Sequence, residues 1–286
     1  MCVSLSNYIT LCKPRVVMLM ILTSMVGMSL VPTIDFSWEK FWWGNIGIAL
    51  MACSAAVVNH LADQRIDRLM RRTQHRPIAS YHISNVHAAI FSAVMGVSGF
   101  ILLVIWVNTL TAFLTFCALI GYAVIYTLYL KYATAQNIVI GGLAGAAPPL
   151  LGWVAMTGHV DFDAIVLLLI IFVWTPPHFW ALAIDRVDEY AKAGVPMLPV
   201  TRGIAYTKLH IVWYVAVLCA VSLLPFVVHL SGWIYLSIAL MLNMRFLMLA
   251  LQLHRSDNPL LPKKVFQFSI VYLMGLFLAL LMDRFF

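Results

Sequence analysis

The chain of 286 residues is 63% hydrophobic and only 10% charged, with a mean hydropathy of +0.94. This composition excludes an ordinary soluble domain and predicts an all-α, polytopic membrane protein. The net charge of +7 must therefore be divided between the two sides of a membrane before it is taken as affinity for nucleic acid, and no nucleic-acid partner is expected. The five cysteines show no CxxC or Cys/His spacing, which argues against a disulfide framework or a zinc site.

Hydropathy along the chain predicts about nine transmembrane helices in a single domain, residues 1–286. Each apolar run is close to the roughly 20 residues that cross a bilayer as a helix. The predicted spans are residues 15–33, 41–58, 86–107, 109–130, 137–157, 164–184, 210–230, 232–253 and 265–282. Long connections follow the second and the sixth span, which suggests a pseudo-repeat of spans 1–4 and 5–8 with the ninth appended. Pro148 and Pro149 are expected to break the fifth helix near its outer half.

The basic residues indicate how the chain is oriented in the membrane. Most of the 18 lysines and arginines lie at the N-terminus or in the connections after even-numbered spans. The positive-inside rule therefore places the N-terminus and the long loops in the cytoplasm, and the C-terminus outside. This topology fits a multi-pass protein of a bacterial inner membrane.

One charged stretch, residues 59–77, stands out from the apolar remainder. Asn59, Asp63 and Asp67 follow one another at steps of four, which places them on one face of a helix. Carboxylate and amide oxygens suit Mg²⁺, which is typically held by one or two carboxylates together with substrate phosphates. The alternative interpretation is a solvated helical salt-bridge ladder, because Asp67 and Arg71 are also four residues apart.

The second long connection carries a similar acidic group. Asp185, Asp188 and Glu189 follow the sixth span, and a continuing helix would place Asp185 and Glu189 on one face. Two acidic groups at matching places in the two halves predict a pair of metal sites that face one another across a cavity.

Four blocks of sequence together resemble a known family. They are NxxxDxxxD at Asn59, Asp63 and Asp67, MxRTxxRP over residues 70–77, NIVIGGLAGAAPPLLGW over residues 137–153, and the run from PHFWALA to DEYAKAGVPMLPV over residues 177–200. The first two blocks resemble the intramembrane prenyltransferases of the UbiA superfamily. All four together are similar to its haem-farnesylating branch, the protohaem IX farnesyltransferases or haem O synthases.

The resemblance implies a helical bundle with a central cavity that opens to the cytoplasm. It implies Mg²⁺-dependent transfer of a farnesyl group from farnesyl diphosphate to a vinyl group of haem B, which is a substrate and not a cofactor, to give haem O. It assigns Asn59, Asp63 and Asp67 to the metal and the diphosphate. It also implies a role upstream of a haem-copper oxidase, so assembly proteins of such an oxidase are candidate partners.

The resemblance leaves the second motif open. The superfamily usually has DxxxD there, whereas this chain has DRVDEY, so either Asp185 or Asp188 is the main metal ligand and Glu189 is a candidate third. Asp63, Asp67, Asp185 and Asp188 are the candidate catalytic residues.

Two anions, the diphosphate and the haem propionates, require cationic partners. The candidates, which the sequence does not divide between the two anions, are Arg68, Arg71, Arg72, Arg76, Lys131 and Arg202. His178 lies seven residues before Asp185, about 10 Å along a helix and on nearly the same face, and is the candidate axial ligand of haem. The alternative interpretation of His178 is a hydrogen-bonded structural histidine.

Two rival functions use the same features. A sister prenyltransferase that acts on an aromatic or quinone precursor would need the same metal motifs, and only the blocks at residues 137–153 and 177–200 favour haem. A secondary transporter of an organic anion would also place polar residues inside a membrane. Its anion, however, would be repelled by the acidic residues unless a divalent metal intervened.

Overall fold

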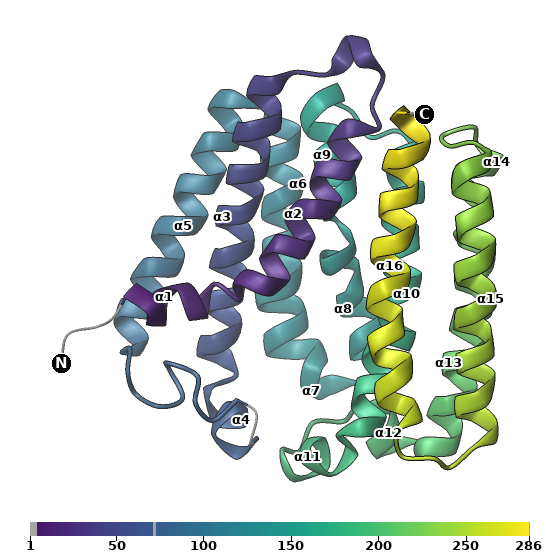
Figure 1. The fold of residues 1–286 in the computed structure, drawn as a ribbon. Coiled ribbons are helices and arrows are strands. Elements are labelled where there is room, and N and C mark those ends of the chain that lie inside the picture. Colours follow the sequence, from purple (N-terminus) through teal and green to yellow (C-terminus); the bar gives the residue numbers. More distant parts are fainter. Residues whose placement is uncertain (1–4, 71–72, 286) are drawn as a thin grey trace. The chain divides into compact units, whose positions relative to one another are not determined.

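The computed structural model describes residues 5–70 and 73–285, and every regular element in this part of the chain is helical (Figure 1). The predicted all-α fold is confirmed. Among the described residues, eight helices are long and apolar enough to cross a membrane, and a bent pair of helices near the N-terminus makes a ninth span if it is counted as one. The chain is therefore a multi-pass membrane protein.

The first predicted span, residues 15–33, differs from the helix that forms. The long helix α2 (Pro14–Ser29) has only 16 residues and is bent by 54° from the preceding α1 (Leu5–Leu11). Lys13 at the bend has φ 49°, in the left-handed region, and Pro14 begins α2 where a missing backbone N–H costs nothing. Because of this bend, α1 and α2 do not form one straight helix.

The chain forms two compact units, of which the first holds the chain up to Tyr132 together with Ala147–Val160. α3 packs against α1, α2, α5, α6 and α9. The elements of this unit, besides α1 and α2, are η1 (Thr33–Asp35), α3 (Trp38–Ala62), α4 (Gln64–Leu69), α5 (Asn85–Trp106), α6 (Thr109–Ile120), the π-helix η2 (Gly121–Leu130) and α9 (Pro148–Thr157), with α7 (Lys131–Ala133) at its boundary.

Small residues allow the closest helix contacts of the first unit. On α2, Gly27 lies against the backbone of Pro149, and on α9, Gly152 lies against the backbone of Ser24, so a side chain at either glycine would overlap its neighbour. Close backbone approach of this kind is typical of helix pairs in membranes. α3 and α5 are also joined by a hydrogen bond of 3.0 Å between the hydroxyls of Ser54 and Ser92.

The second unit holds Ala133–Ala146 and Asp161–Phe286. α10 is in contact with α8, α13 and α16, and Pro176 and Pro177 lie within α10 without ending it. Its elements are α8 (Asn137–Ala146), α10 (Phe162–Asp185), α11 (Val187–Lys192), α12 (Leu198–Thr201), α13 (Ile204–Val221), α14 (Leu224–Val227), α15 (Trp233–Arg255) and α16 (Leu261–Phe285).

The fifth predicted span is interrupted, as Pro148 and Pro149 predict. α8 ends at Ala146 and α9 begins at Pro148, so Ala147 separates two helical segments. The two segments belong to different compact units, whereas the sequence suggested a repeat that began with the whole fifth span. The proposed division into spans 1–4 and 5–8 stays a prediction.

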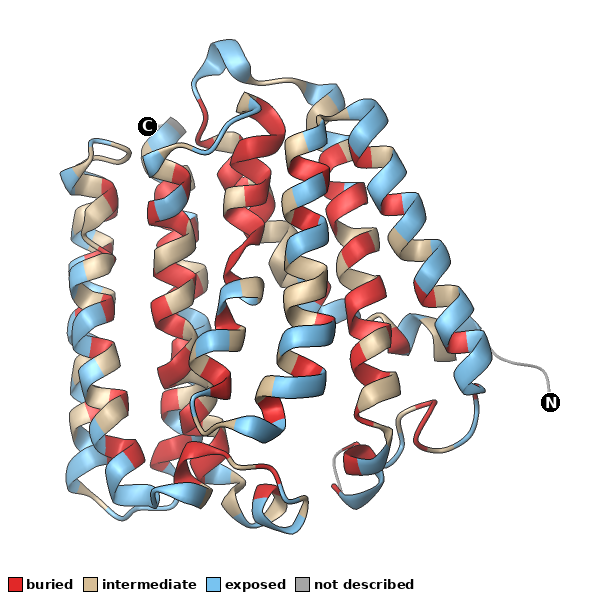
Figure 2. Cartoon of the chain, turned by 180° about the vertical axis from the view of Figure 1, so that it is seen from behind, coloured by how far each residue is buried: buried red, intermediate tan, exposed pale blue. Residues whose placement is uncertain are grey.

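Buried and exposed residues alternate along the helices, as Figure 2 shows. On α5 the buried residues are Ala88, Ser92, Gly99 and Leu103, most of them small. Apolar residues such as Val86 and Ile90 are exposed on the same helix. Exposed aliphatic side chains on a helix of this hydropathy are accounted for by contact with lipid.

Candidate functional site

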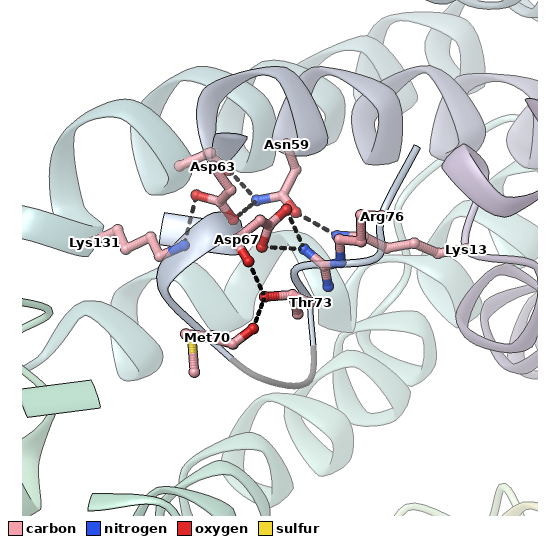
Figure 3. A network of polar contacts seen from close by, with 9 residues as sticks. Lys13, Asn59, Asp63, Asp67, Met70, Thr73, Arg76 and Lys131 are labelled. Atoms are coloured by element: carbon pink, nitrogen blue, oxygen red, sulfur yellow. Dashed lines mark hydrogen bonds and ion pairs between the residues drawn. The ribbon is translucent and has the colours of Figure 1, made fainter. Parts of the chain in front are cut away.

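The first acidic motif lies at the junction of α3 and α4. α3 ends at Ala62, and Asp63 has φ −83° and ψ 1°, outside the regular helix. The backbone N–H of Asp63 nevertheless donates to Asn59 (2.9 Å), and that of Asp67 donates to Asp63 (2.8 Å). Because these bonds keep the four-residue repeat, the three polar side chains gather in one cluster (Figure 3).

Both carboxylates of this cluster are buried and paired with cations. Asp63 and Asp67 are 5% and 3% exposed. Lys131 Nζ donates to Asp63 Oδ1 at 2.6 Å, and Arg76 Nη1 donates to both carboxylate oxygens of Asp67 at 2.8 and 2.9 Å. A solvated helical ladder does not describe the site, since the carboxylates are buried and neither partner is four residues away on the same helix: Arg76 is nine residues from Asp67, and Lys131 is 68 residues from Asp63.

Asn59 is held in one orientation by three contacts. Its Nδ2 donates to Asp63 Oδ2 (3.0 Å) and to Thr127 Oγ1 (3.2 Å), while its Oδ1 accepts from Lys13 Nζ. Thr127 donates its own proton to the carbonyl of Tyr122 at 2.7 Å, so its oxygen can only accept from the amide. The carbonyl oxygen of Asn59 is therefore the end of the amide that faces a cation.

Lys13, Thr73 and Thr127 are cluster residues that sequence reasoning missed. Lys13 was used only to predict the orientation of the chain in the membrane, because nothing in the sequence indicates that the residue at the bend before α2 contacts Asn59. Thr127 lies in a ten-residue π-helix, η2, a rare conformation that often occurs at functional sites but has no plain sequence signal. Thr73 Oγ1 donates to the carbonyl of Asp67 at 3.2 Å and supports the turn that brings Arg76 back to the cluster.

The six candidate anion-binding residues are in different environments. Arg76 and Lys131 are in the cluster. Arg68 donates to the carbonyl of Ala79 (3.3 Å) and lies 4.4 Å from the ring centre of Tyr81, so it fastens the following loop. Arg202 is exposed directly after α12. Arg71 and Arg72 lie outside the described residues.

The second acidic motif has a different local structure. α10 ends at Asp185, Arg186 has φ −129° and ψ 28°, and α11 begins at Val187. The expectation that Asp185 and Glu189 share one continuous helical face is therefore wrong, because the helix is interrupted between them. Asp185 and Asp188 are exposed, and the carboxylate of Asp185 is 4.0 Å from Arg186 Nε.

Glu189 differs from its two acidic neighbours. Its Oε2 is buried and has no hydrogen-bond partner among the described residues. A buried carboxylate oxygen without a partner is costly, so this atom requires a cation or a donor that the described residues do not supply.

His178 lies on α10 and is in contact with α16. Its Nδ1 is 2.6 Å from the hydroxyl of Ser269, and its ring stacks on Trp174 and on Phe266. The structure thus supports the hydrogen-bonded interpretation for one ring nitrogen. The role of the other nitrogen is treated below.

The donor set of the first cluster fits Mg²⁺. It offers two carboxylates and one oriented amide oxygen, the hard ligands that this ion prefers, and it leaves room in the coordination shell for phosphate oxygens. Among the described residues no three His, Cys, Asp or Glu side chains are grouped so that they could hold a metal ion. Burial raises the pKa of Asp67, and the ion pair with Arg76 opposes the rise, so a further cation would stabilise the charged carboxylate.

Comparison with known proteins gives consistent results. The UbiA prenyltransferase family matches residues 20–281. The chain is 57% identical to the protoheme IX farnesyltransferase of Hahella chejuensis, over 98% of this chain and 93% of that protein. It is 59% identical to the protoheme IX farnesyltransferase of Coxiella burnetii, over 98% of this chain and 92% of that protein.

Solved structures share the fold at low sequence identity. A digeranylgeranylglyceryl phosphate synthase superposes with a TM-score of 0.82 at 19% identity and covers 98% of both chains. A UbiA homolog from Archaeoglobus fulgidus bound to DMAPP and Mg²⁺ superposes with a TM-score of 0.70 at 16% identity, over 96% of this chain and 99% of that chain.

Proposed function

Because the chain belongs to the UbiA prenyltransferase family, we propose that it transfers the farnesyl group of farnesyl diphosphate to a vinyl group of haem B and so forms haem O. The relatives at 57% and 59% identity carry the assignment of the acceptor. The observation that carries the chemistry is the buried cluster of Asn59, Asp63 and Asp67, with a cationic side chain on each of them.

The cluster matches a metal-bound diphosphate in charge. Arg76 and Lys131 each contact one of the two carboxylates, and Lys13 contacts the amide oxygen of Asn59, so basic side chains outnumber carboxylates in the cluster before any metal binds. Asn59, Asp63 and Asp67 would hold Mg²⁺, which when bound supplies positive charge to the leaving diphosphate. Arg76 and Lys131 would then exchange their carboxylate contacts for phosphate oxygens, and Lys13 would exchange its contact with Asn59.

The chain's own residues stabilise the charge that develops as the allylic C–O bond opens. Arg76 offers a planar donor group that suits phosphate oxygens, and Lys131 and Lys13 add compact charges. The terminal carbon of the haem vinyl group attacks the allylic carbon as diphosphate leaves. Water then adds to the resulting cation beside the macrocycle and loses a proton, which gives the hydroxyethylfarnesyl side chain.

Burial of the cluster protects the reaction from water. Asp63 and Asp67 are almost inaccessible to solvent, and each is paired with a basic side chain. Water that reached the farnesyl cation early would release farnesol, so exclusion of water is part of the chemistry. The exposed Asp185 and Asp188 are proposed as ligands of a second metal site, together with the oxygen of Glu189 that has no partner among the described residues.

The proposal also covers the membrane in which the protein lies, its orientation there and the proteins that receive its product. We place the chain in a bacterial inner membrane with the N-terminus, the first motif and the second motif on the cytoplasmic side, where farnesyl diphosphate is soluble. Assembly proteins of a haem-copper oxidase are proposed as the recipients of the product.

Product analysis tests the assignment. Purified protein in detergent is given haem B, farnesyl diphosphate and Mg²⁺, and the pigment is separated by reverse-phase chromatography with mass detection. A later-eluting haem with the mass of the hydroxyethylfarnesyl product is expected, and it should disappear with EDTA. Unmodified haem, together with prenylation of 4-hydroxybenzoate or of a naphthoate under the same conditions, would show that the acceptor is aromatic and that the haem assignment is wrong.

A further inference from the structure

A polar contact joins α10 to α16 within the apolar interior of the second unit. Ser269 on α16 is fully buried, and its hydroxyl lies 2.6 Å from His178 Nδ1 and donates to the carbonyl of Phe266 at 2.6 Å. The backbone carbonyl of Ser269 accepts from Trp174 Nε1 at 2.7 Å. These contacts hold both the backbone and the hydroxyl of Ser269 in place beside the imidazole.

The hydrogen bonds determine which nitrogen of His178 carries the proton. A serine hydroxyl has one proton, and in Ser269 it lies on the Phe266 carbonyl, so the hydroxyl oxygen must accept from Nδ1–H. A neutral ring protonated at Nδ1 keeps its lone pair on Nε2. Within the part of the chain that the structure describes, Nε2 has no hydrogen-bond partner, and the side chain is only partly buried.

The ring is also held in place by its neighbours. Its centre lies 4.2 Å from that of Trp174 with 21° between the planes, and 4.6 Å from that of Phe266 with 28° between the planes. Rotation of the imidazole would break both stacks and the bond to Ser269. A structural histidine needs one such anchor, but a fixed ring with an unused nitrogen lone pair is the arrangement of a metal ligand whose second nitrogen is bound by a supporting group.

We propose that His178 Nε2 is the axial ligand of the iron of bound haem B, and that Ser269 is a positioning residue that holds the ligating tautomer. This inference rests on the proposed function for its ligand, because among the acceptors considered only haem contains iron. Imidazole is a common axial ligand of haem iron, and an acceptor for its Nδ1–H raises its basicity. Ligation would fix the height of the macrocycle along α10 without taking part in bond formation.

Absorption spectroscopy of the full-length protein with haem B tests the ligand. His178→Gly should shift the Soret band and weaken haem binding by about 10-fold or more. Added imidazole should restore the wild-type band, because it can occupy the space that the side chain leaves between Trp174 and Phe266. His254→Gly, at an exposed histidine in the last turn of α15, is the matched control and should leave the band unchanged.

Resonance Raman spectroscopy of the ferrous haem complex tests the positioning residue. The iron–histidine stretching frequency reports on the hydrogen bond at Nδ1, so it should fall in Ser269→Ala and be retained in Ser269→Thr. A merely structural role of Ser269 would not move this frequency in a protein that still binds haem.

The outcomes separate this inference from the proposed function. Wild-type affinity and spectrum in His178→Gly would overturn the ligand assignment even if farnesyl transfer to haem is normal. An unchanged stretching frequency in Ser269→Ala would overturn the role of Ser269. Wild-type protein that binds haem through His178 but returns it unmodified with farnesyl diphosphate and Mg²⁺ would instead contradict the proposed function and leave the ligand in place.

Discussion

The two acidic motifs contain the same residue types, but the fold treats them differently. In the first motif each carboxylate is buried and its charge is balanced by a lysine or an arginine. In the second, Asp185 and Asp188 are exposed, and the buried oxygen of Glu189 has no partner among the described residues. If both motifs bind metal as proposed, the first is organised in advance by its ion pairs, whereas the second would depend on ligand to complete it.

The largest effect is expected from the first motif. Asp67→Asn should lower kcat/KM by about 10²–10³-fold, because it removes a charged metal ligand and leaves Arg76 without its carboxylate. Steady-state kinetics with haem B and farnesyl diphosphate would measure this. Asp35→Asn, at an exposed aspartate in η1, is the control and should behave as wild type. Near-normal turnover by Asp67→Asn would show that the first motif is not the more important of the two for catalysis.

The second motif should respond less strongly and in a definite order. Glu189→Gln should raise the Mg²⁺ concentration needed for half-maximal activity by about 10–100-fold, since Glu189 contributes the unpaired buried oxygen. Asp185→Asn and Asp188→Asn should have smaller effects, because their carboxylates are already solvated. Titration of activity with Mg²⁺ would rank the three variants. If Asp188→Asn had the largest effect, the exposure of a carboxylate would not predict which residue is the main metal ligand, and Asp188 would take that role in place of Glu189.

Thr127 offers a way to weaken the first motif without touching its charges. Thr127→Val removes the acceptor for Asn59 Nδ2 and releases the orientation of the amide, so metal affinity should fall by about 10-fold. Thr127→Ser keeps the hydroxyl and should retain most of the affinity. Calorimetric titration with Mg²⁺ in the presence of an unreactive diphosphate analogue measures the change. Equal affinity in the two variants would show that Thr127 does not position Asn59.

The smallest effect concerns an ion pair that lies near water. Lys208 Nζ donates to Asp257 Oδ1 at 2.9 Å and lowers the pKa of that fully exposed carboxylate. A carboxylate with a lowered folded-state pKa adds stability above its unfolded-state pKa, and this stability is lost as pH falls through the folded-state pKa. Asp257→Asn should therefore lower Tm slightly at neutral pH and not at strongly acidic pH. A loss of Tm that is the same at both pH values would show that the charge of Asp257 is not its cause.

Most of the helical framework could be predicted from sequence, because long apolar runs have few alternatives in a membrane. The second span is seen as Trp38–Ala62 where residues 41–58 were expected, and Pro148 and Pro149 do interrupt the fifth. The first span was placed almost at the start of α2, but its end was set at residue 33 whereas α2 ends at Ser29, and the separate α1 was not foreseen because hydropathy does not register the left-handed Lys13 between the two helices. Hydropathy also ended the second span at residue 58, although α3 continues to Ala62 and backbone hydrogen bonds carry the repeat on to Asp67.

The site was predictable only as far as local spacing reaches. Steps of four brought Asn59, Asp63 and Asp67 together because the backbone keeps its helical hydrogen bonds through the junction. The same spacing failed at Asp185 and Glu189, where Arg186 interrupts the helix. The partners of the carboxylates could not be assigned from sequence, because Arg76 returns through a loop after α4 and Lys131 approaches from α7, so both contacts depend on tertiary structure.

Metal binding measured directly tests the central claim, that the buried first motif holds the divalent metal of a prenyl diphosphate. Mn²⁺ can stand in for Mg²⁺ and its binding can be followed by electron paramagnetic resonance, with and without an unreactive thiolo analogue of farnesyl diphosphate. Wild-type protein should bind Mn²⁺ more tightly when the analogue is present, Asp67→Asn should lose at least about 10-fold in affinity, and Asp35→Asn should not. Wild-type affinity for Mn²⁺ in Asp67→Asn, with the analogue bound, would contradict the account.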